Sequence, residues 1–209
     1  MRKIKLGNIN ILKPELGSAN TLAASVFFFL TGISSGIFLE LFMNPAQKHG
    51  VAQYLFEYLI NESSDLSYPN PFFSSLGSNL FLLLIILVSG LTVYGFPFAL
   101  LTLLYKGFVL GFSSCLIIEE LSLKGISLIL LTIIPQNLLL VPAFLAAAAG
   151  CLHYSFIKLS DRRDRLYPQK SRKSQISKAT YCMFFILPAI IILIGCVIES
   201  LIFLVVSSP

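Results

Sequence analysis

Long runs of apolar residues alternate with shorter polar segments along the whole chain. The five apolar blocks run from Thr21 to Met43, from Ser78 to Tyr105, from Gly107 to Ile118, from Ile126 to Ile157 and from Thr180 to Val206. An α-helix rises about 1.5 Å per residue, so about 20 apolar residues cross the roughly 30 Å hydrocarbon core of a bilayer. The pattern predicts an all-α fold, a polytopic membrane helical bundle with about five transmembrane helices.

Prolines and glycines interrupt two of these blocks. Gly95-Phe96-Pro97 lies inside the second block, and the fourth block carries Pro135 and Pro142. Proline lacks the N–H of a helical hydrogen bond, so we expect proline-broken second and fourth helices. The block from Gly107 to Ile118 predicts a short or tilted third helix. If it were re-entrant, the basic loop that follows the fourth block would move to the other side of the membrane.

The polar segments between the blocks set the domain organisation. Residues 1–20 are expected to form a cytoplasmic N-terminal segment, and residues 21–209 a single transmembrane helical domain. This domain includes an outer loop, 44–77, with a short amphipathic helix over 51–60, and a cytoplasmic basic loop, 158–179. The first block is longer than the apolar region of a signal peptide, and no convincing small-residue cleavage site follows it, which indicates an uncleaved anchor.

Composition and charge support the same class of protein. Apolar residues make up 56% of the chain and charged residues 12%, against about 45–50% and about 25% in soluble domains. The net charge is +5, and eight of the fifteen basic residues fall between Lys158 and Lys178. With a cytoplasmic N-terminus, thirteen basic residues lie inside and only Lys48 and Lys124 outside, as the positive-inside rule requires. This distribution predicts a C-terminus outside the cell and argues against a nucleic-acid partner.

Side chains that could catalyse a reaction or bind a metal are few. The chain has two histidines, His49 and His153, and one double glutamate, Glu119-Glu120. Intramembrane proteases of the prenyl-endopeptidase type hold a metal with such a pair and distant histidines, but here the two histidines are predicted on opposite sides of the membrane. The four cysteines form no CxxC pair and suit apolar packing. We therefore predict no catalytic residue, no metal site and no cofactor.

Glycines within the blocks indicate close contacts between helices. Gly32-x-x-x-Gly36 and Gly107-x-x-x-Gly111 have the spacing that lets two membrane helices approach each other. Such a contact forms either within one chain or between the chains of an oligomer, and the sequence leaves this open.

The fourth block contains Ile134-Pro135-Gln136-Asn137. Amide side chains are costly in hydrocarbon unless they form hydrogen bonds. We expect at least one of the two to face the bundle and to bond a carbonyl near Leu131 or a polar group on the third helix. This segment is either a structural hinge satisfied by its neighbours or a polar site for a substrate, a lipid or a partner.

Two motifs stand out between Gly95 and Ile157. One is Tyr105-Lys106-Gly107 followed by Gly111, and the other is Pro135-Gln136-Asn137 with Pro142 beyond it. In these motifs and in the order of its blocks, the chain resembles the stage II sporulation protein M family, multi-pass membrane proteins of endospore-forming bacteria. The residues assigned a structural or interaction role are Lys106, Gly107, Gly111, Pro135, Gln136, Asn137 and Pro142.

The resemblance implies a non-enzymatic role in the cell membrane, among membrane lipids. Members of this family act when the mother-cell membrane engulfs the forespore, and they hold two peptidoglycan-degrading partners, stage II sporulation proteins D and P, at the septal membrane. The residues themselves indicate only a membrane protein without a recognisable active site. The rival interpretation is a transporter or permease subunit, which the broken helices and the polar residues near the middle of the membrane favour.

Overall fold

A computed structural model describes residues 19–53, 71–92, 94–166 and 177–207, which are almost entirely helical. Its elements, in chain order, are α1 (Ala19–Leu41), α3 (Pro71–Leu91), α4 (Phe96–Leu128), the π-helical segment η1 (Ile129–Ile133), α5 (Ile134–Leu166), α6 (Lys178–Phe184) and α7 (Ile186–Ser207). Residues 45–53 form a further short stretch of helix. The helix expected over 51–60 is thus seen as far as residue 53, and the rest lies outside the described residues.

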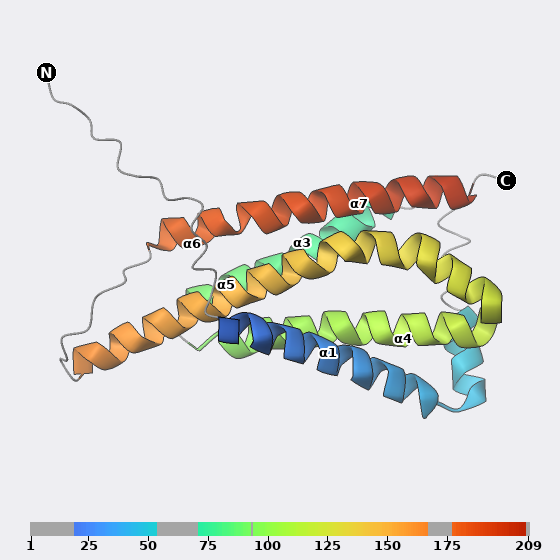
Figure 1. The fold of residues 1–209 in the computed structure, drawn as a ribbon, viewed down its shortest axis with the longest axis horizontal. Helices are drawn as coiled ribbons and strands as arrows, with labels where there is room; N and C mark the ends of the chain where they lie inside the picture. Colours follow the sequence, from blue (N-terminus) through green and yellow to red (C-terminus); the bar gives the residue numbers. More distant parts are fainter. Residues whose placement is uncertain (1–18, 54–70, 93, 167–176, 208–209) are drawn as a thin grey trace, which may run out of the picture.

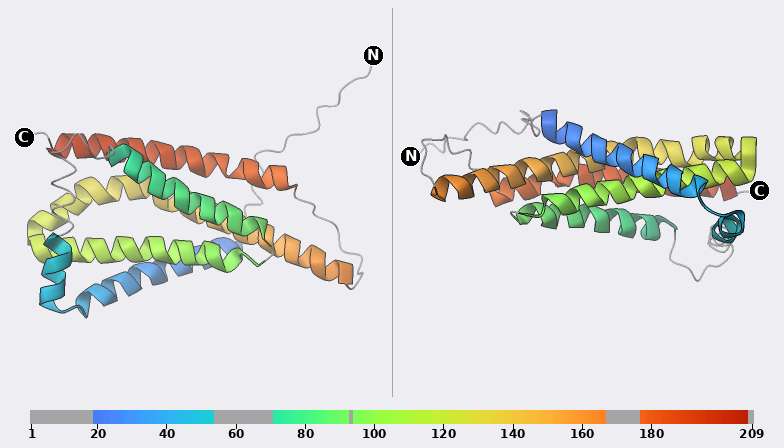
Figure 2. Two further views of the ribbon diagram at one scale, coloured as in Figure 1. Left: turned by 180° about the vertical axis from the view of Figure 1, so that it is seen from behind. Right: turned by 90° about the horizontal axis from the view of Figure 1, so that it is seen from below.

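Five helices within the described residues are long and apolar enough to cross a membrane. The all-α bundle with five spans is therefore confirmed. The long helices α1, α3, α4, α5 and α7 run alternately in opposite directions (Figures 1 and 2). We call the end where α1, α4 and α6 begin the basic end, and the opposite end, with Glu40, Glu119 and Glu120, the acidic end.

The prediction of a short third helix is wrong. Gly95 and Pro97 do not kink the second helix, because α3 has already ended at Leu91 and α4 begins at Phe96. A proline in the first turn of a helix loses no hydrogen bond, so this position suits Pro97. The turn is tight enough to require glycine, since a Cβ atom on Gly95 would lie 1.8 Å from the Ser89 carbonyl oxygen.

The other boundaries shift accordingly. The third span runs over Phe96–Glu120 at full length. The second helix starts at Pro71, seven residues before the expected Ser78 and within the expected outer loop. At the basic end, α5 continues to Leu166 and enters the expected basic loop.

The fourth helix is interrupted at one of its two prolines. Between α4 and α5 the backbone stays helical while it turns at the acidic end (Figure 1). The π-helical segment η1 stands directly before Pro135, the second residue of α5, whereas α5 continues through Pro142. A π-helical turn accommodates the hydrogen bond that a proline cannot make. The interruption of the regular α-helix is thus directly before Pro135 and not at Pro142.

The central helix of the bundle is α5. In its most apolar window 56% of the residues are buried, against 22% for α1. Its inward face combines small and large residues, Ala143, Phe144, Ala147, Ala148 and Cys151, all almost completely buried. Helices α3, α4 and α7 pack around this face. In contrast, α1 lies at the edge of the bundle and packs chiefly along α4 (Figure 2).

Candidate functional site

The two glycine pairs face one another and form one seam between α1 and α4. A Cβ atom on Gly107 would lie 2.3 Å from the Phe29 carbonyl oxygen, and one on Gly111 2.3 Å from that of Ile33. From the other side, a Cβ atom on Gly36 would lie 2.3 Å from the Phe108 carbonyl oxygen. Because real Cβ contacts do not fall below 3.0 Å, the two backbones touch only where side chains are missing. The predicted helix-packing role of these pairs is realised within one chain.

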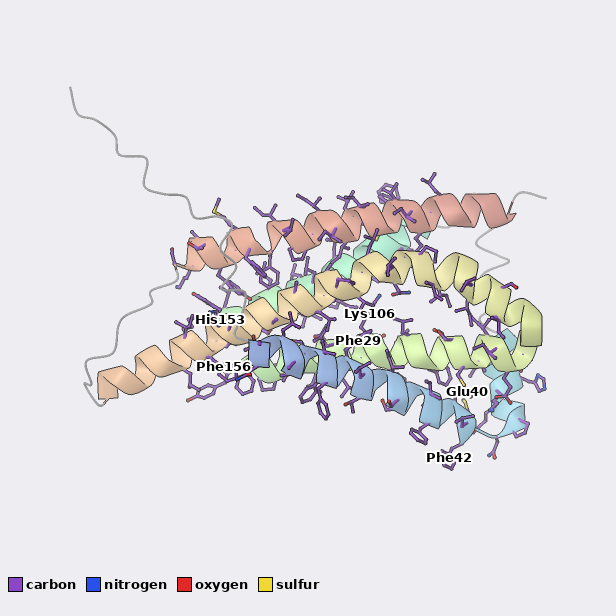
Figure 3. All side chains as sticks on the ribbon, viewed as in Figure 1. Phe29, Glu40, Phe42, Lys106, His153 and Phe156 are labelled. Atoms are coloured by element: carbon purple, nitrogen blue, oxygen red, sulfur yellow. The ribbon has the colours of Figure 1, made fainter. Side chains whose placement is uncertain are left out.

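Lys106 lies one residue before this seam but on another face of α4, near the middle of the bundle (Figure 3). It comes ten residues after the start of the third span, about 15 Å along the helix. A lysine at this depth costs roughly 2.5–3.5 kcal/mol on insertion scales. The sequence interpretation counted Lys106 among the inner basic residues, and that assignment is wrong because α4 begins earlier than expected.

The ammonium of Lys106 donates a hydrogen bond to a neutral amide. Its Nζ atom donates to Oδ1 of Asn79 on α3 at 2.8 Å, and it lies 5.5 Å from the ring centroid of Phe144. The amide nitrogen of Asn79 donates in turn to the Ser75 carbonyl oxygen at 2.9 Å. The Ser75 hydroxyl donates to the Glu199 carboxylate on α7. Lys106, Asn79, Ser75 and Glu199 thus form a polar file from the middle of the bundle toward the acidic end.

A cavity of about 140 Å³ lies beside Lys106, where α4 and α5 diverge below the bend. Its lining residues come from three consecutive elements: Lys106, Val109, Leu110 and Ser113 of α4, Ile133 of η1, and Gln136 and Asn137 of α5. An apolar cavity of about 150 Å³ stays dry, whereas a polar one admits water or a polar group. Polar side chains line this cavity from both α4 and α5, and apolar side chains of α4 and η1 complete the lining.

The two amides of α5 differ in how they are satisfied. The Asn137 amide nitrogen donates to the Ile133 carbonyl oxygen at 2.8 Å. The bond goes to a carbonyl two residues from the predicted Leu131, within the π-helical segment, and not to Leu131 itself. Oε1 of Gln136 is buried and has no hydrogen-bond partner among the described residues. An unpaired buried acceptor is costly, so this wall of the cavity is incomplete.

A second cluster of charged residues closes the acidic end. The Lys48 ammonium lies 3.1 Å from Oε1 of Glu40 and 2.5 Å from Oε2 of Glu119. Glu40 is completely buried, and its other oxygen accepts a hydrogen bond from the Cys115 thiol at 3.0 Å. Hydrogen bonding to Glu119, followed by that to Glu40, raises the pKa of Lys48. We call Glu40, Lys48 and Glu119 the acidic-end clamp, because they hold the helical residues 45–53 against α1 and α4.

The double glutamate is engaged in this region. Glu119 belongs to the acidic-end clamp, and Oε1 of Glu120 lies 3.3 Å from Nδ1 of His49. His153 lies in the other half of the bundle, as expected from the sequence (Figure 3). Within the described residues, no three His, Cys, Asp or Glu side chains gather as a metal ion would require.

Most of the residues assigned an interaction role from sequence come together around α4. Lys106, Gln136 and Asn137 line the cavity, Gly107 and Gly111 form the seam, and Pro135 marks the break beside the cavity. Pro142, by contrast, lies exposed on α5.

Sequence reasoning missed Asn79, Ser75, Glu199 and the pairing of Glu40 with Lys48. A signal for three of them exists, because Asn79, Glu40 and Glu199 are strongly polar residues within or at the edge of apolar blocks. In a membrane such residues need partners. The partners themselves depend on how each helix is rotated, which apolar blocks do not reveal.

One of three comparisons with known proteins, the one against family models, gives a match. The family model described as Stage II sporulation protein M matches residues 25–202, which covers all five spans apart from the first six residues of α1. No curated protein matches the chain, and no solved structure does. The seam, the polar file and the cavity all lie within the matched region. The chain therefore belongs to the stage II sporulation protein M family of sporulation membrane proteins.

Proposed function

We propose that this protein is a non-enzymatic scaffold that holds peptidoglycan-degrading enzymes at the septal membrane during engulfment. The partners proposed are stage II sporulation proteins D and P. The observation that carries the proposal is the acidic end, where charged side chains are engaged with one another. Lys48 pairs with Glu40 and Glu119, and His49 lies beside Glu120. Such ion pairs fix the positions of the segments at this end relative to one another, and a docking surface requires fixed positions.

The seam supports the same role. Backbone contact between α1 and α4 leaves these helices little freedom to move against each other. The outer faces of the bundle carry many exposed large apolar side chains, for example Phe27, Phe38 and Leu193. These faces suit membrane lipids. A rigid core with its charged groups paired at one end favours a scaffold over a protein that works by opening and closing.

The proposed orientation places the basic end in the cytoplasm and the acidic end outside. Four basic residues precede α1, and eight lie from Lys158 to Lys178, whereas only Lys48 and Lys124 lie toward the acidic end. This twelve-to-two division still satisfies the positive-inside rule after Lys106 is removed from the count. The acidic end would then face the space where peptidoglycan is degraded.

Cysteine labelling tests this orientation. Single cysteines at Arg163 and at Asp65, in a chain without its four native cysteines, are treated with an impermeant thiol reagent in intact cells. We expect labelling at position 65 and none at position 163 until the cells are opened. Labelling at position 163 from outside would reverse the orientation and remove the outer platform.

Deletion in the native host tests the scaffold itself. Fluorescent fusions to the two hydrolases are followed in sporulating cells, and the engulfing membrane is stained. We expect engulfment to stop and both hydrolases to disperse from the septum. Purification of the tagged chain from detergent-solubilised sporulating cells should recover both enzymes.

A matched control separates loss of the platform from loss of the protein. Gly77 has no neighbouring atom within 4 Å of an added Cβ, so a Gly77→Ala copy should restore engulfment fully. Normal engulfment in the deletion strain, with both hydrolases still at the septum, contradicts the proposal.

The transporter interpretation retains one supporting observation. Transporters bind substrates near the bilayer middle where helices are broken, and the cavity lies beside Lys106 and the break at Pro135. A transporter would produce an engulfment defect with both hydrolases still in place. The localisation experiment above therefore distinguishes the two.

A further inference from the structure

The Lys106 ammonium beside the cavity is only partly satisfied by direct contacts. Within the described residues Lys106 has one hydrogen-bond acceptor, Oδ1 of Asn79, and is in no ion pair. An ammonium has three protons to donate. On the opposite wall, Oε1 of Gln136 is buried without a donor. The described residues therefore supply neither a carboxylate in contact with Lys106 nor a donor to Gln136.

The cavity is reachable from the surface of the bundle. Val109 at its edge is 43% exposed, and Leu110, Ser113 and Ile133 are half-buried. A volume of about 140 Å³ resembles the cavity of about 150 Å³ that admits one benzene molecule. It accommodates one carboxylic side chain and a bridging water, but no larger group.

Among the described residues, no carboxylate contacts Lys106 directly, and Glu199 is connected to it only through Ser75 and Asn79. The acidic side chains within the described residues lie beyond the spans or toward their ends. Glu40 and Glu119 belong to the acidic-end clamp, and Glu199 accepts from Ser75. A second copy of the chain has the same residues at the same depths. A carboxylate in direct contact with Lys106 would therefore come from another molecule.

The depth of Lys106 decides which kind of molecule. It lies ten residues after the start of the span and fourteen before its end at Glu120, about 15 Å and about 21 Å along the helix. A lipid phosphate at either surface does not reach it, and a dissolved anion would lose its hydration on the way. A transmembrane helix with one acidic residue at its centre carries a carboxylate to this depth.

We propose that the cavity lined by Lys106, Val109 and Gln136 binds the membrane-spanning helix of a partner protein through a central Asp or Glu of that helix. Lys106 pairs with the carboxylate, and a water between the carboxylate and Gln136 satisfies the buried Oε1. The apolar edge formed by Val109 and Leu110 packs against the partner helix. The inference rests on the proposed scaffold function, because it supplies the means by which an anchored partner is held.

A designed host helix tests this in purified form. The full chain and a leucine–alanine transmembrane peptide with one central Asp are reconstituted in phosphatidylcholine vesicles, and binding is followed by energy transfer between fluorophores. The matched peptide carries Asn in place of Asp. We expect the wild-type chain to bind the Asp peptide at least tenfold more tightly than the Asn peptide.

Four variants locate the effect. Lys106→Gln should abolish the preference and Lys106→Arg should keep it, because only the second retains the charge. Val109→Trp fills the cavity edge without changing any charge, and it too should abolish the preference. Lys178→Gln removes a lysine at the start of α6, outside the cavity, and should change nothing.

Two results overturn the proposal. One is equal binding of both peptides by the wild-type chain, and the other is a preference that survives in Lys106→Gln. If Lys106→Gln does not fold, Val109→Trp decides alone, since a surviving preference there places the pairing elsewhere. The peptide contains no hydrolase, so these results stand apart from the recruitment experiment that tests the scaffold.

Discussion

Two neighbouring faces of α4 differ in how closely they pack. Toward α1, Gly107 and Gly111 bring the backbones into contact and leave no space. Toward α5, Lys106 and Ser113 face a cavity with an unpaired acceptor on its far wall. The first contact is fully packed within the chain, whereas the second leaves a cavity and an acceptor without a donor among the described residues. We infer that the seam supplies the stability of the bundle and the cavity supplies its capacity to bind.

This contrast explains why neighbouring positions should respond differently to mutation. Lys106 and Gly107 adjoin in sequence, but successive helical residues point about 100° apart. A change at the seam must move a backbone, while a change at the cavity alters only what can enter it.

The largest effect is expected from filling the seam. Gly111→Leu places a side chain where even a Cβ atom would lie 2.3 Å from the Ile33 carbonyl oxygen. We expect a loss of about 3 kcal/mol in the free energy of unfolding, the upper range for overpacking, measured by thermal unfolding in detergent. Gly77→Leu is the matched control, because nothing lies within 4 Å there. Equal losses in both variants would mean that the seam is not a special contact.

The next effect should come from the acidic-end clamp. Lys48→Met leaves the carboxylate of Glu40 buried without its cation, so the melting temperature should fall clearly. Adding Glu40→Gln removes the unpaired charge and should restore most of the loss. A double variant that is no more stable than Lys48→Met would show that the pairing contributes little.

The same ion pair predicts a pH dependence. Hydrogen bonding to Glu119 raises the pKa of Lys48 above its ordinary value of 10.5. The lysine is therefore more firmly protonated in the folded chain, and its contribution is complete below pH 10.5 and lost as pH rises through the higher folded value. Melting temperatures measured from pH 8 upward should separate wild type from Lys48→Met in the neutral range and converge above pH 10.5. A constant difference across the whole range would contradict this assignment.

A smaller effect is expected at the cavity. Lys106→Met gives up the bond to Asn79, and such bonds in membranes are worth about 0.6–2 kcal/mol. It also removes a charge that costs roughly 2.5–3.5 kcal/mol. We expect unfolding in detergent to be unchanged or slightly more difficult. A strong destabilisation would mean that Lys106 serves the fold, and the contrast between the two faces of α4 would fail.

The smallest effect belongs to Asn137. Asn137→Leu removes one hydrogen bond to the Ile133 carbonyl oxygen within the same helix. Insertion should be unaffected, and unfolding should change by at most about 1 kcal/mol. Recruitment of the two hydrolases in sporulating cells should weaken, because the cavity wall is altered. Wild-type recruitment together with unchanged stability would show that this amide is incidental.

The sequence predicted the parts of the fold that lipid enforces. Backbone groups in hydrocarbon must be paired, so long apolar blocks become helices and their number can be counted. Glycines four residues apart predicted close helix contact, although not that the Gly32 and Gly107 pairs would meet each other. At least one of Gln136 and Asn137 was expected to face the bundle, and both line the cavity.

The errors have a common physical origin. The turn between Leu91 and Phe96 is short and nearly as apolar as the helices beside it, so hydropathy gives no boundary there. A proline in an apolar run can mark either a kink or a helix start. Pro97 lies at the start of a helix. Lys106, which was predicted in a loop, therefore lies near the middle of the third span. The partners of Lys106 and Glu40 depended on helix rotation, which periodicity alone did not provide.

The seam also constrains the order in which the bundle assembles. Synthesis proceeds from the N-terminus, so α1 enters the membrane before its partner α4 exists. Between them the ribosome delivers α3, which ends in the turn at Gly95. During that interval the bare backbone at Gly32 and Gly36 faces lipid or the insertion machinery. Helix α1 thus waits for two further spans before it meets its main neighbour, and a slow or mistimed α4 would leave the glycine surface of α1 exposed to other newly inserted proteins.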